Sequence, residues 1–330
     1  MKNYKEVVGI DVSKNTLDAY CHQSQEHREF INDIVGYKSL LKWVLKITKG
    51  DSVFYCFENT GYYSLKLALY LDSQKIVYVE ESPLKIKRSS GIVKEKTDKL
   101  DAVLIARYAW LYREELTPSK VKGKSHLELG RLLALRDLLV RNNAGLKGTL
   151  KEMKMLLSSP TTDTGCIVLK RSIDYQEKQV RSIEDRIQAI ISADASMSKN
   201  YELLTSLKGI GLVIACQLIY HTGNFTRFDS WRAFSSYCGT APYEHRSGTS
   251  IYRKKQCHYL GDRKMKSLLS MASVSAIQHD SELRLYYNRK LAEGKDKMLA
   301  INNVRNKLIA RAFAVVKRGT PYVVLQPYAA

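Results

Sequence analysis

The chain has 330 residues, 45% of them hydrophobic, which is enough for two or three domains with buried cores. Its 53 lysines and arginines outnumber its 33 aspartates and glutamates by 20, and a surplus of this size favours a polyanionic partner over an acidic or neutral one. Six scattered cysteines without a CxxC pair argue against a zinc finger or a disulfide framework, and the absence of a signal peptide or an apolar run of membrane length argues against a membrane role, so we expect a cytoplasmic protein.

The first region alternates strand and helix patterns. A β-branched run from Glu6 to Ile10 predicts a strand that ends at Asp11, and Leu17 to His22 predicts a second strand. The other predicted elements are strands at 53–57, just before Glu58, and at 76–79, and helices at 37–47, 62–71 and 97–112. Strands followed by helical returns predict an α/β domain over residues 1–115.

The middle region, residues 116–200, has a helical heptad pattern. Leucine or methionine recurs every seven residues from Leu132 to Met153, and after a break at 159–163 isoleucine or valine recurs at the same spacing from Ile173 to Ile187. The sequence therefore predicts two central coiled-coil helices. It leaves open whether they form an antiparallel hairpin, a dimerising coiled coil or part of an ordinary helical bundle.

The third region, residues 201–330, is predicted to be mainly helical. It holds 20 basic and 8 acidic side chains, so a surplus of 12 makes it the main electrostatic footprint. In LLTSLKGIGLVIACQLIY, two apolar helical pieces flank Gly209 and Gly211, a layout that predicts a helix-hairpin-helix. Backbone N–H groups at such a helix start suit a phosphate oxygen. A glycine turn without a ligand is the alternative, and the basic surroundings favour phosphate binding.

Four carboxylates occupy the positions that a metal site needs. Asp11 and Glu58 each follow an apolar strand, and Asp98 and Asp101 lie three residues apart at the start of a helix, on one helix face. Residues at strand ends converge at one edge of a sheet, where helix starts join them. Singly, each acid also fits an ordinary turn or helix-start role. Together they predict an oxygen-only site for Mg²⁺, with two metals, that acts on a phosphodiester.

These segments carry a resemblance to a known family. The stretches VVGIDVSKNTLD, FENTG and KTDKLDAVLIARY, followed by LKGIGLVIAC and FDSWRAFSSYCGTAPYEHRSGTS, are similar to the DEDD-type transposases of bacterial insertion sequences. These are bridge-RNA-guided recombinases related to the pilin-gene invertases. The resemblance spans nearly the whole chain, and its motifs lie in the expected order.

The resemblance implies a specific chemistry. The first domain would be RNase H-like, similar to a Holliday-junction resolvase, with Asp11, Glu58, Asp98 and Asp101 as its Mg²⁺ ligands. The third domain would supply Ser247 as the nucleophile for a phosphoserine link to DNA. The protein would act near the nucleoid as a dimer or tetramer, on double-stranded donor and target DNA, guided by a structured noncoding RNA.

Ser247 lies between Arg246, which would steer a phosphate, and Gly248, which would allow close backbone approach. From the residues alone, an ordinary turn serine is the simpler interpretation, and the resemblance reverses this preference. The other candidate nucleophiles, which fit the flanking pattern less well, are Ser250, Ser236 and Ser235.

A basic strip follows the serine and is predicted to contact phosphates. Its members are Arg253, Lys254, Lys255, Arg263, Lys264 and Lys266. Tyrosines interleave with it, and they suit either stacking on unpaired bases or ordinary packing. The segment from Gln256 to Tyr259 departs from the family pattern, which leaves the local conformation open.

Two other functions remain compatible with the residues. A metal-dependent nuclease or junction resolvase that uses water would keep the four acids and need no serine. A non-enzymatic nucleic-acid-binding protein would use only the glycine turn and the basic strip, and the four acids argue against it.

Overall fold

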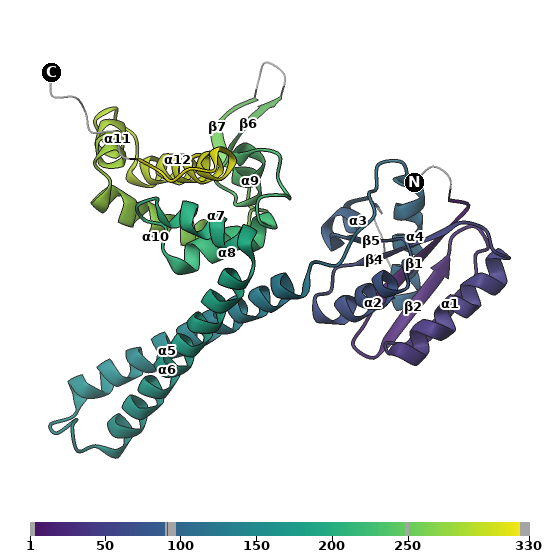
Figure 1. The fold of residues 1–330 in the computed structure, drawn as a ribbon, viewed down its shortest axis with the longest axis horizontal. Helices are drawn as coiled ribbons and strands as arrows, with labels where there is room; N and C mark the ends of the chain where they lie inside the picture. Colours follow the sequence, from purple (N-terminus) through teal and green to yellow (C-terminus); the bar gives the residue numbers. More distant parts are fainter. Residues whose placement is uncertain (1–3, 90, 92–96, 248–250, 324–330) are drawn as a thin grey trace. The chain divides into compact units, whose positions relative to one another are not determined.

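The computed structural model describes residues 4–89, 91, 97–247 and 251–323, and for residues 245–247 and 251–255 it describes the backbone alone. The chain divides into two compact units, Met1–Lys122 and Gly123–Ala330 (Figure 1). The finer predicted division at residues 115 and 200 stays a prediction. Of the helices in the described ranges, none combines the length and the apolarity that a membrane span needs.

A five-stranded sheet forms the centre of the first unit, with the order β3-β2-β1-β4-β5. The strands are β1 (Glu6–Val12), β2 (Thr16–Cys21), β3 (His27–Ile31), β4 (Val53–Glu58) and β5 (Tyr78–Glu81). β4 runs parallel to both β1 and β5, whereas β2 runs antiparallel to β1 and β3. The predicted strands are confirmed, and β3 is an additional edge strand.

Helices cover both faces of this sheet: α1 (Ile34–Thr48), α2 (Tyr62–Ser73), α3 (Pro83–Ser89) and α4 (Asp98–Leu111) (Figure 1). Successive side chains of a strand point to opposite faces. Val8 and Ile10 of β1 therefore pack in the core that α1 and α2 cover, and Val7 packs in the core with α3 and α4. The predicted α/β domain is confirmed, and its sheet places β1 next to β4, with their ends at one edge.

The second unit begins with a helical hairpin, α5 (Lys124–Leu156) and α6 (Thr164–Ala193) (Figure 1). Three ion pairs cross the hairpin: Glu128 with Arg186, Arg136 with Glu184 and Lys147 with Glu177, each at 2.7 Å. Later residues of α5 pair with earlier residues of α6, so the two helices are antiparallel. The predicted helices are confirmed, and of the arrangements that the sequence left open the structure shows the antiparallel hairpin. A dimerising role stays a prediction.

In its described residues, the rest of the second unit is mainly helical, as predicted, and also contains a β-hairpin. The helices are α7 (Ala195–Thr205), α8 (Leu212–Thr222), α9 (Trp231–Tyr237), α10 (Arg263–His279), α11 (Ser281–Ala292) and α12 (Lys297–Arg318). The hairpin strands are β6 (Pro242–Ser247) and β7 (Ile251–Cys257), which pair antiparallel and were not predicted as strands. All six cysteines of the chain are unpaired, and five of them are buried.

The turn between α7 and α8 contains the predicted glycine pair. Gly209 has φ of +91°, and a β-carbon there would lie 2.4 Å from the backbone oxygen of Ala272 in α10. This glycine is required because the turn packs directly against α10 of the same chain. Gly211 is the N-cap of α8 and has open space around it. A phosphate at this turn stays a prediction that concerns Gly211 more than Gly209.

Candidate active site

Close contact between β1 and α4 positions the acidic residues. Gly9 and Asp11 lie two positions apart on the face of β1 that α4 covers. A β-carbon at Gly9 would lie 2.3 Å from the backbone nitrogen of Ala106 and 2.5 Å from the backbone oxygen of Ala102. The helix therefore lies almost on the strand, and its first turn extends over Asp11.

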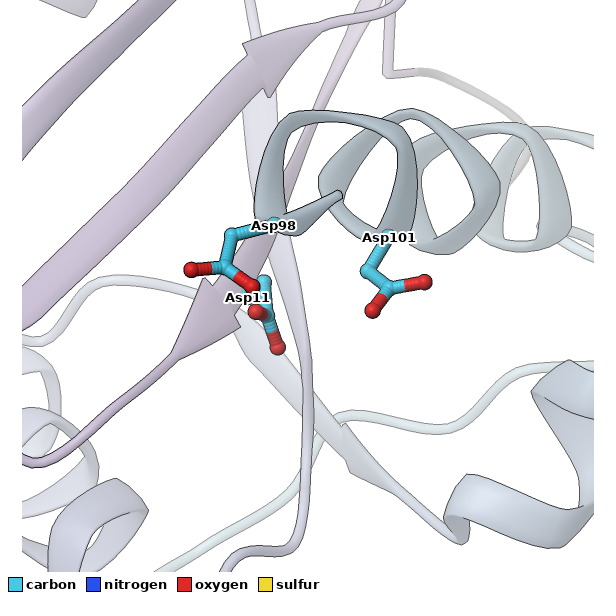
Figure 2. Close-up of side chains that lie close together, drawn as sticks. All are labelled: Asp11, Asp98 and Asp101. Carbon is cyan, nitrogen blue, oxygen red and sulfur yellow. The ribbon is translucent and has the colours of Figure 1, made fainter. Parts of the chain in front are cut away.

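The first turn of α4 carries the other two aspartates. Thr97 caps the helix by accepting a hydrogen bond from the backbone N–H of Leu100 at 3.2 Å, which fixes where the helix begins. Asp98 and Asp101 follow at the three-residue spacing that places them on one face. Carboxylate oxygens of Asp11, Asp98 and Asp101, one from each residue, all lie within 4.8 Å of one another (Figure 2).

The electrostatics of this cluster are unfavourable without a cation. Burial is the largest cause that raises the pKa of Asp11, and the charges of Asp101, Asp98 and Glu58 raise it further, from 3.8 to about 6. Within the described part of the chain, every group that shifts this pKa is acidic, so no lysine or arginine offsets the repulsion. Uncompensated carboxylates at this spacing fit a hard divalent cation.

Glu58 stands slightly apart from the other three acids. It ends β4, the parallel neighbour of β1, and lies outside the group that shares the 4.8 Å spacing. It is close enough that its charge raises the pKa of Asp11. The structure thus brings three of the four predicted acids together and places the fourth at the end of the neighbouring strand.

Ser247 ends β6 in the second unit, paired with Ile251 across the hairpin. Its side chain lies outside the described residues, as do the side chains of Arg246, Arg253, Lys254 and Lys255, so their predicted contacts are untested. Of the alternative nucleophiles, Ser235 is buried, Ser236 hydrogen-bonds to the Tyr243 hydroxyl, and Ser250 lies outside the described residues.

Both ends of this hairpin are held by α12. The side-chain amide of Asn302 donates to the backbone oxygen of Thr240 at 2.9 Å, just before β6 begins, and Asn306 donates to the same oxygen at 3.0 Å. The Cys257 thiol at the end of β7 also donates to that oxygen, at 3.4 Å. Arg305, which is buried, donates to the side-chain oxygen of Asn302 at 3.1 Å. The strand that carries Ser247 therefore starts from a fixed point.

The residues of the basic strip differ in exposure and in pairing, although all of them are lysine or arginine. Lys264 forms an ion pair with Asp137 of α5, which offsets its charge. Arg263, in the first turn of α10, is exposed, and Lys266 is half-buried. Phosphate contact by these residues stays a prediction, and the pairing makes Lys264 the weakest member.

Two of the structurally important residues were missed from the sequence. Gly9 interrupts the β-branched run VVGID, and a glycine inside a strand often marks close approach by another backbone. The sequence therefore contained a signal for the close contact at Gly9. The anchoring role of Asn302 had no local signal, because its partner Thr240 lies 62 positions earlier in the chain.

Comparison with known proteins finds similarity to transposases and to a gene-inverting protein. A family model described as "Transposase" (DEDD_Tnp_IS110) matches residues 8–157, and one described as "Transposase IS116/IS110/IS902 family" matches residues 201–288. The chain is 27% identical over 325 residues to the pilin gene-inverting protein of Moraxella bovis, covering 96% of this chain and 98% of that protein. The Moraxella lacunata protein of the same name matches equally. An uncharacterized 43.6 kDa protein of insertion element IS110 from Streptomyces coelicolor is 30% identical over 171 residues, which cover 51% of this chain and 41% of that protein.

Proposed function

Since the chain belongs to the IS110 family of transposases, enzymes that act on DNA, we propose that it is a metal-dependent recombinase that exchanges DNA strands through a covalent serine link. The observation that carries the proposal is the convergence of Asp11, Asp98 and Asp101 within 4.8 Å. The strand order β3-β2-β1-β4-β5 supports an RNase H-like domain of the kind found in Holliday-junction resolvases.

Asp11, Asp98 and Asp101, with Glu58 beside them, would hold the divalent metal, Mg²⁺ as the first candidate and two ions as the proposed number. When bound, such ions polarise a phosphate and make a nearby hydroxyl more acidic. The raised pKa of Asp11 supports a role for the cluster in holding cations, because a cation would relieve the repulsion among the carboxylates.

Ser247 would attack the phosphorus of one DNA strand. Its Oγ forms a bond to phosphorus while the bond from phosphorus to a deoxyribose oxygen breaks, and the proton lost by the serine is matched by one that this oxygen takes up. In the second step a deoxyribose hydroxyl of another strand attacks the same phosphorus and the serine leaves. Each step makes one phosphate ester as it breaks one, so rejoining needs no ATP.

The proposed partners follow from the charge and from the family. A surplus of 12 basic side chains in residues 201–330 suits donor and target double-stranded DNA and a structured noncoding guide RNA. The α5–α6 hairpin, with exposed apolar side chains such as Leu138 and Met155, is the proposed contact of a dimer or tetramer. We place this assembly in the cytoplasm, at the nucleoid.

The proposal can be tested with the full chain, the noncoding RNA that flanks its gene, donor and target DNA, and Mg²⁺. A denaturing gel should show a protein–DNA adduct that Ser247→Ala and Asp11→Asn each abolish, with Ser250→Ala as the matched serine control. DNA cleavage that survives Ser247→Ala and forms no adduct would instead establish the water-using nuclease. An adduct that persists in Ser247→Ala and disappears in Ser250→Ala would show that Ser250, not Ser247, is the nucleophile.

A further inference from the structure

A cavity of about 520 Å³ opens beside the base of the β6–β7 hairpin. Its walls come from α9, β6 and the loop between β7 and α10: Ser236, Tyr237, Tyr243, His258, Leu260, Gly261 and Asp262. We refer to the cavity lined by these seven residues as the tyrosine pocket. Its volume falls in the range of small-molecule sites, and a single nucleobase fits comfortably inside such a space.

Aromatic rings line the tyrosine pocket and extend its edge. The Tyr243 ring meets the His258 ring edge-on, with centroids 6.3 Å apart, and the Tyr259 ring stacks on this histidine with centroids 4.6 Å apart. Tyr243 is 39% exposed and Tyr259 is 69% exposed. Exposed aromatic rings at a cavity rim are suited to stacking on the flat face of an unpaired base.

Polar groups also line the tyrosine pocket. The Tyr237 hydroxyl donates to Asp262 at 3.1 Å and also lies 2.9 Å from Nδ1 of His221, and the Ser236 hydroxyl is hydrogen-bonded to that of Tyr243. The backbone N–H of Leu260 donates to Nδ1 of His258 at 3.2 Å, which leaves Nε2 of that ring as the donor in the neutral form. The pocket therefore offers both donors and acceptors for the edge of a base.

The backbone behind the tyrosine pocket is tightly fixed. A β-carbon on Gly261 would lie 2.2 Å from the Cα of Gly239, so the loop before α10 lies directly against the end of α9. The backbone N–H of Asp262 donates to the backbone oxygen of Tyr237 at 2.8 Å. This framework preforms the cavity, so binding a flat ligand there requires little ordering of the chain.

The surroundings favour a nucleic acid over a neutral ligand. The guanidinium of Arg227 lies over the Tyr237 ring at 5.2 Å, Arg232 lies over Trp231 at 4.7 Å, and Arg263 is exposed at the start of α10. Tyr243 and Ser247 belong to the same strand, four residues or roughly 13 Å apart at the usual rise of a strand. A base in the tyrosine pocket would thus lie within a few nucleotides of the phosphate at Ser247.

We propose that the tyrosine pocket binds one unpaired nucleobase of the DNA strand that Ser247 cleaves, by stacking on Tyr243 and His258. The choice of DNA over other ligands rests on the proposed function, whereas the base-binding chemistry rests on the pocket itself. Capture of an extrahelical base would hold the strand next to the nucleophile and would explain why these aromatic rings lie exposed on a basic surface.

The experiment uses the full chain with a short single-stranded DNA that carries the fluorescent adenine analogue 2-aminopurine, in EDTA so that no metal takes part. Stacking on an aromatic ring quenches this base. We expect quenching with the wild-type protein, a loss of about 10-fold in affinity for Tyr243→Ala and for His258→Ala, and near-normal binding for Tyr243→Phe, which keeps the ring. Tyr175→Ala on α6, where the tyrosine is 64% exposed, is the matched control and should bind normally.

Unchanged quenching in both alanine variants, or tighter binding of the ribonucleotide version through the same residues, would overturn the proposal. The double variant Asp11→Asn, Ser247→Ala should retain full quenching. If the proposed strand exchange is wrong but the base pocket exists, quenching therefore persists. If the base pocket does not exist, the Tyr243 and His258 variants bind like the wild type. Thermal unfolding of each variant checks that the fold is intact, and because Tyr243 is exposed and His258 is half-buried, their replacement should leave the core unaltered.

Discussion

Gly9 of β1 lies against the backbone of Ala106 in α4, so closely that a β-carbon on the glycine would lie 2.3 Å from the Ala106 nitrogen. Glycine is the residue that permits this approach. Two residues further along the same face is Asp11, and one to two turns back along the helix are Asp98 and Asp101. The missing side chain at Gly9 thus sets the separation of the three carboxylates.

Gly9→Ala should separate α4 from β1 and disperse the acidic cluster. We expect a loss of about 3 kcal/mol in the free energy of unfolding from overpacking, and roughly 10- to 100-fold weaker binding of Mn²⁺ or Mg²⁺. Urea denaturation and calorimetric titration measure the two effects. Gly148→Ala is the control, because this α5 glycine has open space around it and should be stabilised by about 0.5–1 kcal/mol.

Asp11→Asn should change how stability depends on pH. Because the pKa of Asp11 is raised from 3.8 to about 6 in the metal-free fold, the folded state retains a proton that the unfolded chain releases. The free energy of unfolding therefore falls as pH rises through this window and stays low above it. We expect the asparagine variant to be more stable than wild type by roughly 1–2 kcal/mol at about pH 7, after allowing for solvent screening, and by much less at about pH 4.

Denaturation in EDTA at both pH values measures this difference. Adding Mg²⁺ at neutral pH should stabilise the wild-type protein and leave the asparagine variant little changed, since the ion relieves the repulsion only where the carboxylate is present. An advantage for the variant that is equal at both pH values would contradict the role given to Asp11.

Asn302→Ala should loosen the β6–β7 hairpin. The variant loses the hydrogen bond to the Thr240 backbone and removes the Asn302 side-chain oxygen to which buried Arg305 donates, so we expect a loss of about 1–3 kcal/mol in the free energy of unfolding. The rate of serine–DNA adduct formation should fall as well, even at temperatures where the protein stays folded. Asn303→Ala, at the next and half-buried position of α12, is the matched control and should leave both quantities near wild type.

Arg311→Ala should be strongly destabilising. Arg311 donates to Asp280 at 2.8 Å, and Asp280 is only 2% exposed while it also caps α11 through the Leu283 N–H. Removing the arginine strands a buried carboxylate, which costs about 3–5 kcal/mol. Glu282→Ala breaks the exposed bridge of the same arginine and should cost less than about 1 kcal/mol, and similar losses for the two variants would refute this distinction.

Much of the first unit could be predicted from the sequence because its strands are apolar and β-branched. The same patterns ended at Asp11 and Glu58, and the sheet topology then explains why these ends meet. β3 escaped prediction because HREFI is mostly polar, as suits an exposed edge strand. The separation between Glu58 and the three aspartates depends on side-chain placement, which no local pattern encodes.

The second unit was harder to predict where its strands are polar. β6 and β7 have the sequences PYEHRS and IYRKKQC, which lack the apolar alternation of a half-buried strand. Their basic residues were interpreted as a phosphate-binding strip, so the two strands were not predicted. The tyrosine pocket could not be predicted from the sequence, because its cavity lies where α9, β6 and a loop meet. The interleaved tyrosines were the one sequence feature that indicated it.

The anchoring of the hairpin by α12 also sets an order of events during synthesis. Thr240 precedes its partner Asn302 by 62 positions, so the hairpin leaves the ribosome well before the helix that holds it. Until α12 emerges and packs, the β6–β7 hairpin that carries the proposed nucleophile lacks the Asn302 hydrogen bond that anchors it. A partly translated chain would thus be unable to form the proposed serine–DNA link, even with DNA of its own gene.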